Sequence, residues 1–154
     1  MSAAAPDQGA ADRSRVGAMA GSRRWLFRPD QAGEILPVPA ISPVPHAKAW
    51  FAGLANVRGN LVCVVNFAQF LGLPPSGTAS DARLLLVSNR LGAHCALLVD
   101  KVLGLTDTAK LIPTSARPDQ PWIAARLADD AGERWDDVNG AALVGSDAFL
   151  QAGE

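Results

Sequence analysis

The residues of this chain best suited to catalysis or metal binding are Cys63, Cys95, His46 and His94. A reactive cysteine needs an exposed, electropositive setting, but both cysteines lie in apolar runs. Neither histidine has a second histidine or a carboxylate at metal-ligand spacing. His94 adjoins Cys95, and neighbours on a strand point to opposite faces, so they do not form a catalytic pair. The sequence therefore predicts no enzyme and no metal or other cofactor, with buried thiols in a reducing cytoplasm.

Arg58 indicates a different kind of chemistry, because it is the one cation in the turn Asn56-Val57-Arg58-Gly59-Asn60. Arginine offers five donors in a fixed fork and is common at interface hot spots. Gly59 lets the backbone turn tightly and keeps bulk away from a partner. We therefore predict that Arg58 contacts another protein. The alternative is that Arg58 holds its own loop by bonding backbone carbonyls.

The segments beside this turn have to position it. Residues 50–54 form an aromatic anchor, and residues 61–65 are an apolar, β-branched run of the kind found in strands buried on both faces. Asn66 is placed to cap a helix over residues 67–71, which Gly72 ends. The turn is therefore expected between two buried segments.

Length and composition limit the protein's class. A chain of 154 residues with 49% apolar residues and a net charge of −1 is most simply one soluble globular domain. That charge argues against an electrostatic nucleic-acid binder. No stretch approaches the roughly 20 apolar residues of a membrane span, so direct membrane insertion is not expected. Residues 1–12 read as a disordered tail, and residues 13–154 as the domain.

The remaining pattern is mostly that of short strands. Glu34-Ile35-Leu36-Pro37-Val38-Pro39 is extended, and its prolines confine it to an edge or a crossing connection, where it is free to pair with another chain or to form a covered loop. Glycine- and proline-rich stretches separate the other strands. Strands are predicted at 15–19, 24–27, 83–88, 93–99, 101–105, 111–113, 122–128 and 133–138, with a short helix capped by Asn139 and a last turn capped by Ser146.

An internal repeat connects these segments. Trp50-Phe51-Ala52 matches Trp122-Ile123-Ala124, and Trp25-Leu26-Phe27 matches Leu97-Leu98-Val99, both at a shift of 72 residues (122 − 50). Val65-Asn66 matches Val138-Asn139 one residue further on. Several matches in one order predict two related β-subdomains, with halves at about 13–75 and 81–150. Trp50 and Trp122 are expected at equivalent places in them.

A resemblance to CheW-like domains is carried by the residues around the turn. They are Gly53-Leu54-Ala55-Asn56-Val57-Arg58-Gly59-Asn60-Leu61, then Val64-Val65-Asn66-Phe67 and Leu71-Gly72, and in the second half Leu97-Leu98-Val99-Asp100-Lys101-Val102-Leu103-Gly104. The resemblance extends from about Arg15 to Leu150. The stretch Glu34 to Pro39 and the terminal Asp-Ala-Phe-Leu resemble the PilI-type branch of the family, which belongs to type IV pilus twitching systems.

The resemblance implies a mainly β protein of two intertwined, five-stranded SH3-like barrels with short helices and a hydrophobic core between them. It implies a non-enzymatic cytoplasmic adaptor, recruited to membrane-associated receptor arrays. Its partners would be the cytoplasmic tip of a methyl-accepting chemoreceptor (PilJ-like) and the regulatory domain of a CheA-like histidine kinase (ChpA-like). Carried over by position, the partner-binding residues are Asn56, Val57, Arg58 and Gly59 in the turn, with Glu34 and Ile35 on the receptor-side strand.

Four positions depart from the family pattern. Val57 stands where leucine is usual, Cys63 where proline is common, and Asn66 and Ala68 where aspartate and arginine are usual. Any salt bridge of that last pair is therefore missing. Two other functions stay open: an SH3-like module that binds proline-rich peptides, which would need an aromatic-lined groove, and a small enzyme using Cys63 or Cys95.

Overall fold

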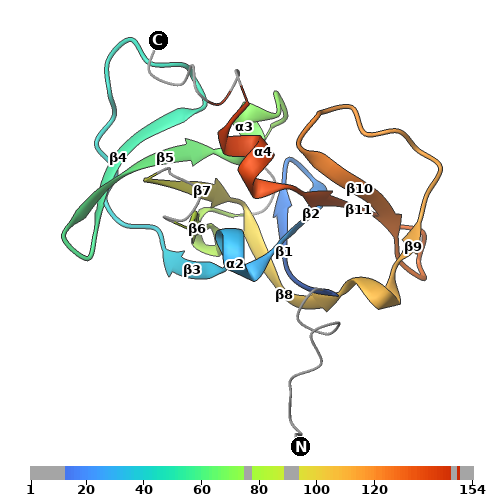
Figure 1. The fold of residues 1–154 in the computed structure, drawn as a ribbon. Coiled ribbons are helices and arrows are strands. Elements are labelled where there is room, and N and C mark those ends of the chain that lie inside the picture. The colour runs from blue at the N-terminus through green and yellow to red at the C-terminus, as the bar shows by residue number, and fades with distance from the viewer. Residues whose placement is uncertain (1–12, 75–77, 89–93, 147–148, 150–154) are drawn as a thin grey trace, which may run out of the picture.

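The computed structural model describes residues 13–74, 78–88, 94–146 and 149. The tail predicted at residues 1–12 and the tip of the hairpin predicted at 89–92 lie outside them. Strands dominate, and the helices are short (Figure 1): α2 (Pro29–Ala32), α3 (Phe67–Phe70), α4 (Gly140–Val144), and the 3-10 turns η1 (Ala79–Asp81) and η3 (Thr108–Lys110). The prediction of a mainly β fold is confirmed.

The strands form two sheets, seen at the right and the left of Figure 1. The six-stranded sheet has the order β8 (Lys101–Asp107), β1 (Ser14–Ala20), β2 (Arg23–Phe27), β11 (Arg134–Val138), β10 (Ile123–Ala128), β9 (Ile112–Pro113). The five-stranded sheet has the order β3 (Glu34–Pro37), β6 (Arg83–Leu86), β7 (Cys95–Val99), β5 (Asn60–Asn66), β4 (Phe51–Val57). Each sheet contains one parallel pair of neighbouring strands, β2 with β11 in the first and β5 with β7 in the second. The other pairs are antiparallel.

The sheets are intertwined in a specific way. The hairpin β1–β2 comes from the first half of the chain but pairs with β8 and β11 of the second. The hairpin β6–β7 comes from the second half but pairs with β3 and β5 of the first. Each sheet thus takes a hairpin from one half of the sequence repeat and its other strands from the other half. The two sheets correspond to the two SH3-like subdomains.

The tryptophans that define the repeat occupy equivalent places. Trp50 precedes β4, and its carbonyl accepts a hydrogen bond of 2.8 Å from Asn66 N; Trp122 precedes β10, and its carbonyl accepts one of 2.8 Å from Asn139 N. The Asn66 side chain then caps α3 and the Asn139 side chain caps α4, each accepting from the amide three residues on. The prediction of equivalent tryptophans and of both asparagine caps is confirmed.

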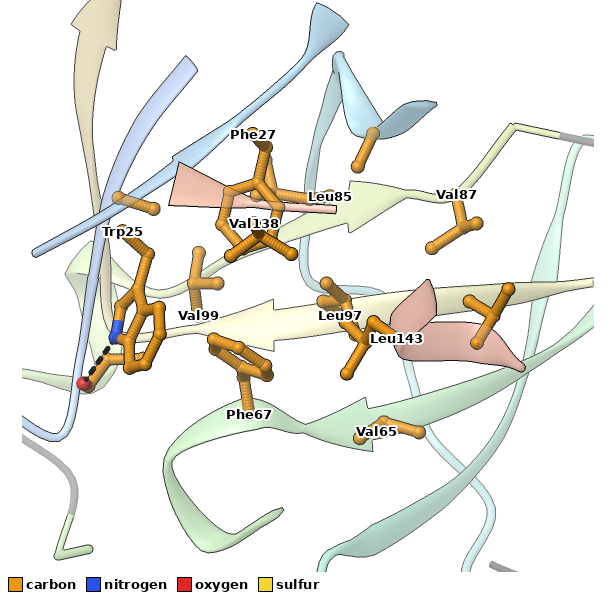
Figure 2. Packing of buried hydrophobic residues seen from close by; sticks show 14 of the residues in the cluster. Trp25, Phe27, Val65, Phe67, Leu85, Val87, Leu97, Val99, Val138 and Leu143 are labelled. Atoms are coloured by element: carbon orange, nitrogen blue, oxygen red, sulfur yellow. Dashed lines mark hydrogen bonds between the residues drawn. The ribbon is translucent and has the colours of Figure 1, made fainter. Parts of the chain in front are cut away.

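The main core lies between the sheets. Figure 2 shows Trp25 and Phe27 of β2 beside Phe67, Leu97 of β7 and Val138 of β11, so residues of both sheets meet in one cluster. The Trp25 and Phe67 rings pack edge to face with centroids 5.1 Å apart. Two smaller clusters fill the individual sheets, around Val62, Val64 and Leu84 in one and Leu26, Leu111 and Leu127 in the other. The predicted hydrophobic core between the subdomains is confirmed.

The sequence predictions need three corrections, two of which concern the turn and its strands. Leu61 is 63% exposed, so β5 is not buried on both faces along its whole length. Leu61, Cys63 and Val65 lie on the same face of β5. Cys63 and Val65 pack on the main core, but the core does not extend as far as Leu61. Strand β4 runs through the aromatic anchor to Val57, so the turn consists of Arg58 and Gly59 alone. Between β2 and β3, Pro29–Ala32 form the short helix α2, which is absent from the predicted elements.

Candidate partner-binding site

The backbone of the β4–β5 turn has an unusual conformation for its residues. Arg58 has φ +53° and Gly59 has φ +82°, and Val57 pairs with Asn60 across them. Two positive φ angles in a two-residue hairpin loop define a type I′ turn. Asn56 Oδ1 accepts a 2.9 Å hydrogen bond from Gly59 N and holds the turn closed. Glycine, asparagine and aspartate favour the first position, so an arginine there has a conformational cost.

Arg58 is ion-paired with Glu34. Its Nη2 atom donates to Glu34 Oε2. Glu34 begins β3, at one edge of the five-stranded sheet, and Arg58 follows β4, at the other edge. The sheet must therefore curl for the pair to form, as an SH3-like barrel does. The Arg58 side chain donates to Glu34 and not to the carbonyls of its own loop. The geometry therefore does not support the alternative in which Arg58 holds the loop.

The ion pair is exposed, which limits its contribution to folding. The Arg58 side chain is 62% exposed and that of Glu34 is 41% exposed. Pairs of this kind stabilise proteins by about 0–1 kcal/mol. Fold stability is therefore a weak reason for an arginine in the left-handed region, and its remaining donors face solvent, where a partner can reach them.

A pocket of about 240 Å³ adjoins this pair. It brings together three predicted site residues from two distant segments, Glu34, Val57 and Arg58. Its other lining residues are Asn60, Val62, Leu86 and His94. A second pocket of about 350 Å³, between α2 and the end of β6, shares Glu34 and Leu86 with it. Two adjoining hollows thus meet at Glu34, the first residue of β3, which has only β6 as a hydrogen-bonded neighbour in the described part of the chain.

The predicted site residues differ in how they lie. Val57 is buried in the core of the five-stranded sheet and also forms part of the pocket wall. Asn56 is exposed, but its side-chain oxygen accepts a hydrogen bond from Gly59 N within the turn. Ile35 is 43% exposed on β3 and is not among the residues lining the two pockets. Glu34 and Arg58 thus come from two distant segments of the prediction, and the fold brings them into direct contact.

Sequence reasoning missed Leu61, Leu86 and His94. Leu61 and Leu86 lie in apolar runs that resemble core strands, and only their position at strand ends distinguishes them. The sequence argues against a metal-binding or catalytic role for His94 but does not show that His94 lines a pocket. It is exposed in the pocket, and its carbonyl accepts a 2.9 Å hydrogen bond from Cys63 N. In the residues that the structure describes, no group of three histidine, cysteine or acidic side chains could hold a metal ion.

The two cysteines are register partners on the parallel strands β5 and β7. Burial raises the pKa of the Cys63 thiol, and burial together with nearby Cys63 raises the pKa of Cys95 to about 12. Both are therefore protonated at neutral pH, the opposite of an activated thiolate. Cys95 is buried as predicted, but Cys63 is only partly buried.

The aromatic residues needed for a proline-reading groove lie in the core instead. Trp25 is 0% exposed and Trp122 is 2% exposed. Trp50 packs edge to face on Phe70, with centroids 4.9 Å apart. The packing of these three tryptophans inside the protein weakens the peptide-module alternative. Among the described helices, none has the length and apolarity to cross a membrane.

Comparison with known proteins supports one family. The family model described as "CheW-like domain" matches residues 16–130. A protein named PilI from Pseudomonas aeruginosa is 30% identical over 126 residues, which cover 71% of this chain and 70% of PilI. The chemotaxis protein CheW of Thermotoga maritima is 34% identical over 65 residues, 42% of each chain.

A solved structure supports the fold. The scaffolding protein TtCheW of Thermoanaerobacter tengcongensis superposes with a TM-score of 0.72 over 88% of this chain and 90% of that chain, at 18% identity. The intertwined sheets described above are therefore shared with a protein whose sequence is largely different.

Proposed function

Because this chain belongs to the CheW-like domain family, we propose that it is a non-enzymatic adaptor that couples a methyl-accepting chemoreceptor to a CheA-like histidine kinase. Its similarity to PilI supports a role in type IV pilus twitching motility, with a PilJ-like receptor and a ChpA-like kinase as partners. The adaptor would act in the cytoplasm, at receptor arrays beneath the membrane.

The observation that carries this proposal is the contact between Glu34 and Arg58. The two segments assigned to partner binding are 24 residues apart and lie at opposite edges of one sheet, yet their charged side chains meet beside one pocket. Ile35 follows Glu34 on β3 and Leu61 lies near the turn on β5, and both are exposed apolar residues. Exposed apolar groups near an arginine are typical of interface hot spots.

Each proposed site residue has a distinct task. Arg58 provides charged donors to the partner, and Glu34 orients the guanidinium from β3. Asn56 and Gly59 hold the turn in its type I′ form. Val57 fixes the end of β4 through the core. Ile35 adds an apolar contact on β3, which among the described residues has no strand on its outer side and can there accept an extended segment.

Replacement of Arg58 by glutamate tests the proposal. Loss of a central interface arginine typically costs about 2 kcal/mol or more, and charge reversal adds repulsion, so affinity for one partner should fall at least roughly thirtyfold. The measurement is titration against a receptor cytoplasmic tip and, separately, a kinase regulatory domain, with a melting curve of the variant. Lys101→Glu, an exposed charge reversal on β8 of the other sheet, is the control for net charge.

A charge swap separates direct contact by Arg58 from a need for the ion pair alone. Glu34→Arg combined with Arg58→Glu rebuilds the ion pair with its ends exchanged. If Arg58 contacts the partner, binding stays weak in the swapped protein. Recovery would mean that binding needs the ion pair and not an arginine at position 58. Unchanged binding of Arg58→Glu to both partners, with an unchanged melt, would remove Arg58 from the site.

A further inference from the structure

A cluster of charged side chains lies on the six-stranded sheet and shares no lining residue with the partner-binding pocket. Its centre is Asp136 on β11, which is 1% exposed. Arg23 Nη2, on β2, donates to Asp136 Oδ2. Arg126 on β10 is the register partner of Asp136, and its Nε lies 3.4 Å from Asp136 Oδ1. A buried carboxylate of this kind is stable in its charged form only when cations surround it.

The cluster contains more cations than its carboxylates neutralise. Arg134 Nε is 3.9 Å from Asp136 Oδ1, and Arg126 Nη2 also pairs with Asp119. Arg23, Arg126 and Arg134 thus face two carboxylates, an excess of one positive charge. Arg134 is the least engaged of the three, since its side chain is 47% exposed and its nearest carboxylate oxygen lies beyond hydrogen-bond distance.

Two buried arginine donors in this cluster need acceptors. Within the described residues, Arg23 Nε, Arg126 Nε and Asp136 Oδ1 are buried and make no hydrogen bond. A small rotation would join Arg126 Nε to Asp136 Oδ1, which are already 3.4 Å apart. Arg23 Nε would still need an acceptor, and a buried donor without one is costly. The Arg23 guanidinium is held 4.5 Å above the Trp25 ring, which restricts its movement.

Arg23 and Arg134 both line a pocket of about 220 Å³. Its other lining residues are Ser22, Arg24, Glu133 and Asp136. Glu133 is neutralised by Arg24 at 2.9 Å, and Asp136 by Arg23 and Arg126. The uncompensated charge in the pocket is therefore that of Arg134. The volume is sufficient for one tetrahedral oxyanion with some of its water.

We propose that this pocket binds a phosphate group, either free or on a small molecule, through Arg23 and Arg134. The guanidinium fork matches the oxygens of phosphate and forms charge-assisted hydrogen bonds with them. A bound phosphate would balance the charge of Arg134, and it would contact Arg23 through the exposed part of that side chain, because Nε is buried. This site is independent of the proposed adaptor surface, because it lies on the other sheet.

Titration of the full chain with sodium phosphate tests the site. Ionic strength is held constant with sodium chloride, and backbone amide signals of residues 22–24 and 133–134 are followed by NMR. Wild type should give saturable shifts at these residues. Arg134→Gln, at a half-exposed position where the fold should survive, should raise the half-saturating concentration at least about tenfold, since it removes charge-assisted hydrogen bonds to the phosphate. Arg28→Gln, which removes a cation from the pair with Asp30, should leave it unchanged.

Three results would overturn the proposal. They are shifts that do not saturate, equal half-saturation in wild type and Arg134→Gln, and equal loss of affinity in Arg28→Gln. A parallel titration with sodium acetate separates phosphate from carboxylate, and an equal response to acetate would overturn the assignment to phosphate. Receptor and kinase binding are measured separately. A negative result in the phosphate titration therefore does not bear on the adaptor proposal.

Discussion

At the scale of single residues, Arg58 has an unfavourable backbone conformation, and its ion pair stabilises the fold only weakly. It has a positive φ in a loop position where asparagine or glycine is preferred, and its exposed ion pair contributes about 0–1 kcal/mol. A residue that is locally unfavourable is evidence for a role outside the fold when the surrounding structure holds it in place. Binding of a partner is such a role.

Replacement of Arg58 by asparagine should therefore separate stability from binding. Relief of the backbone cost should offset the lost ion pair, so the free energy of unfolding should stay equal or rise by up to ~1 kcal/mol. A rise of that size would increase Tm by about 2–4 °C in a chain of this length. Affinity for one partner should fall in the same variant. Calorimetry and titration measure the two effects.

Arg58→Val is the matched control for the backbone. A β-branched residue is strained at positive φ, so valine should lower Tm where asparagine does not. Equal melting of the two variants would mean that the turn carries no conformational cost, and would weaken the argument from strain.

Residues that act locally were the ones the sequence could identify. Asn66 and Asn139 were predicted as caps because a cap depends on the next three residues, and both side chains accept the expected amides. The contact of Glu34 with Arg58 was not predictable from the chain, because it depends on the curl that brings two sheet edges together. Arg58 was identified from its turn and Glu34 from the family resemblance, each without its partner.

At the scale of elements, β5 shows how far a hydrophobic pattern determines a strand. Its apolar run predicted burial on both faces, which holds for Val64 and Val65 at 0% and 1% exposure. Val64 packs in the core of its own sheet, and Val65 packs in the core between the sheets. The run continues to Leu61, which is exposed, because composition does not show where the supporting core ends.

Aspartate substitutions along β5 should follow this division. Val64→Asp or Val65→Asp places an unpaired charge in a core and should cost several kcal/mol, enough to unfold the protein. Leu61→Asp, on the same strand, should change the free energy of unfolding by only about 0.5 kcal/mol. Chemical denaturation of the three variants gives the comparison. Wild-type melting of both valine variants would place β5 outside the core.

At the scale of the whole molecule, the exchanged hairpins make the two halves of the chain interdependent. The sequence repeat predicted two related subdomains and their order of elements, since both follow from local similarity. It did not show which half supplies each hairpin, because strand pairing between distant segments leaves no periodic signal. Neither half contains a complete sheet: β1–β2 needs β8 and β11, and β6–β7 needs β3 and β5.

Cutting the chain in the connection between α3 and η1 should therefore abolish folding of the separate pieces. Removing the second half exposes Val16, Trp25, Leu26 and Phe27, all nearly fully buried in the intact protein. At about 1.5–3 kcal/mol for each side chain, the loss is roughly 6–12 kcal/mol, which equals the usual stability of a whole domain. Fragments 1–78 and 79–154 should each lack a cooperative thermal transition, whereas an equimolar mixture should regain the β circular dichroism spectrum and the transition of the intact chain. A cooperative melt in either fragment alone would show that its half forms a sheet by itself, and the exchange of hairpins would then not be what holds the two subdomains together.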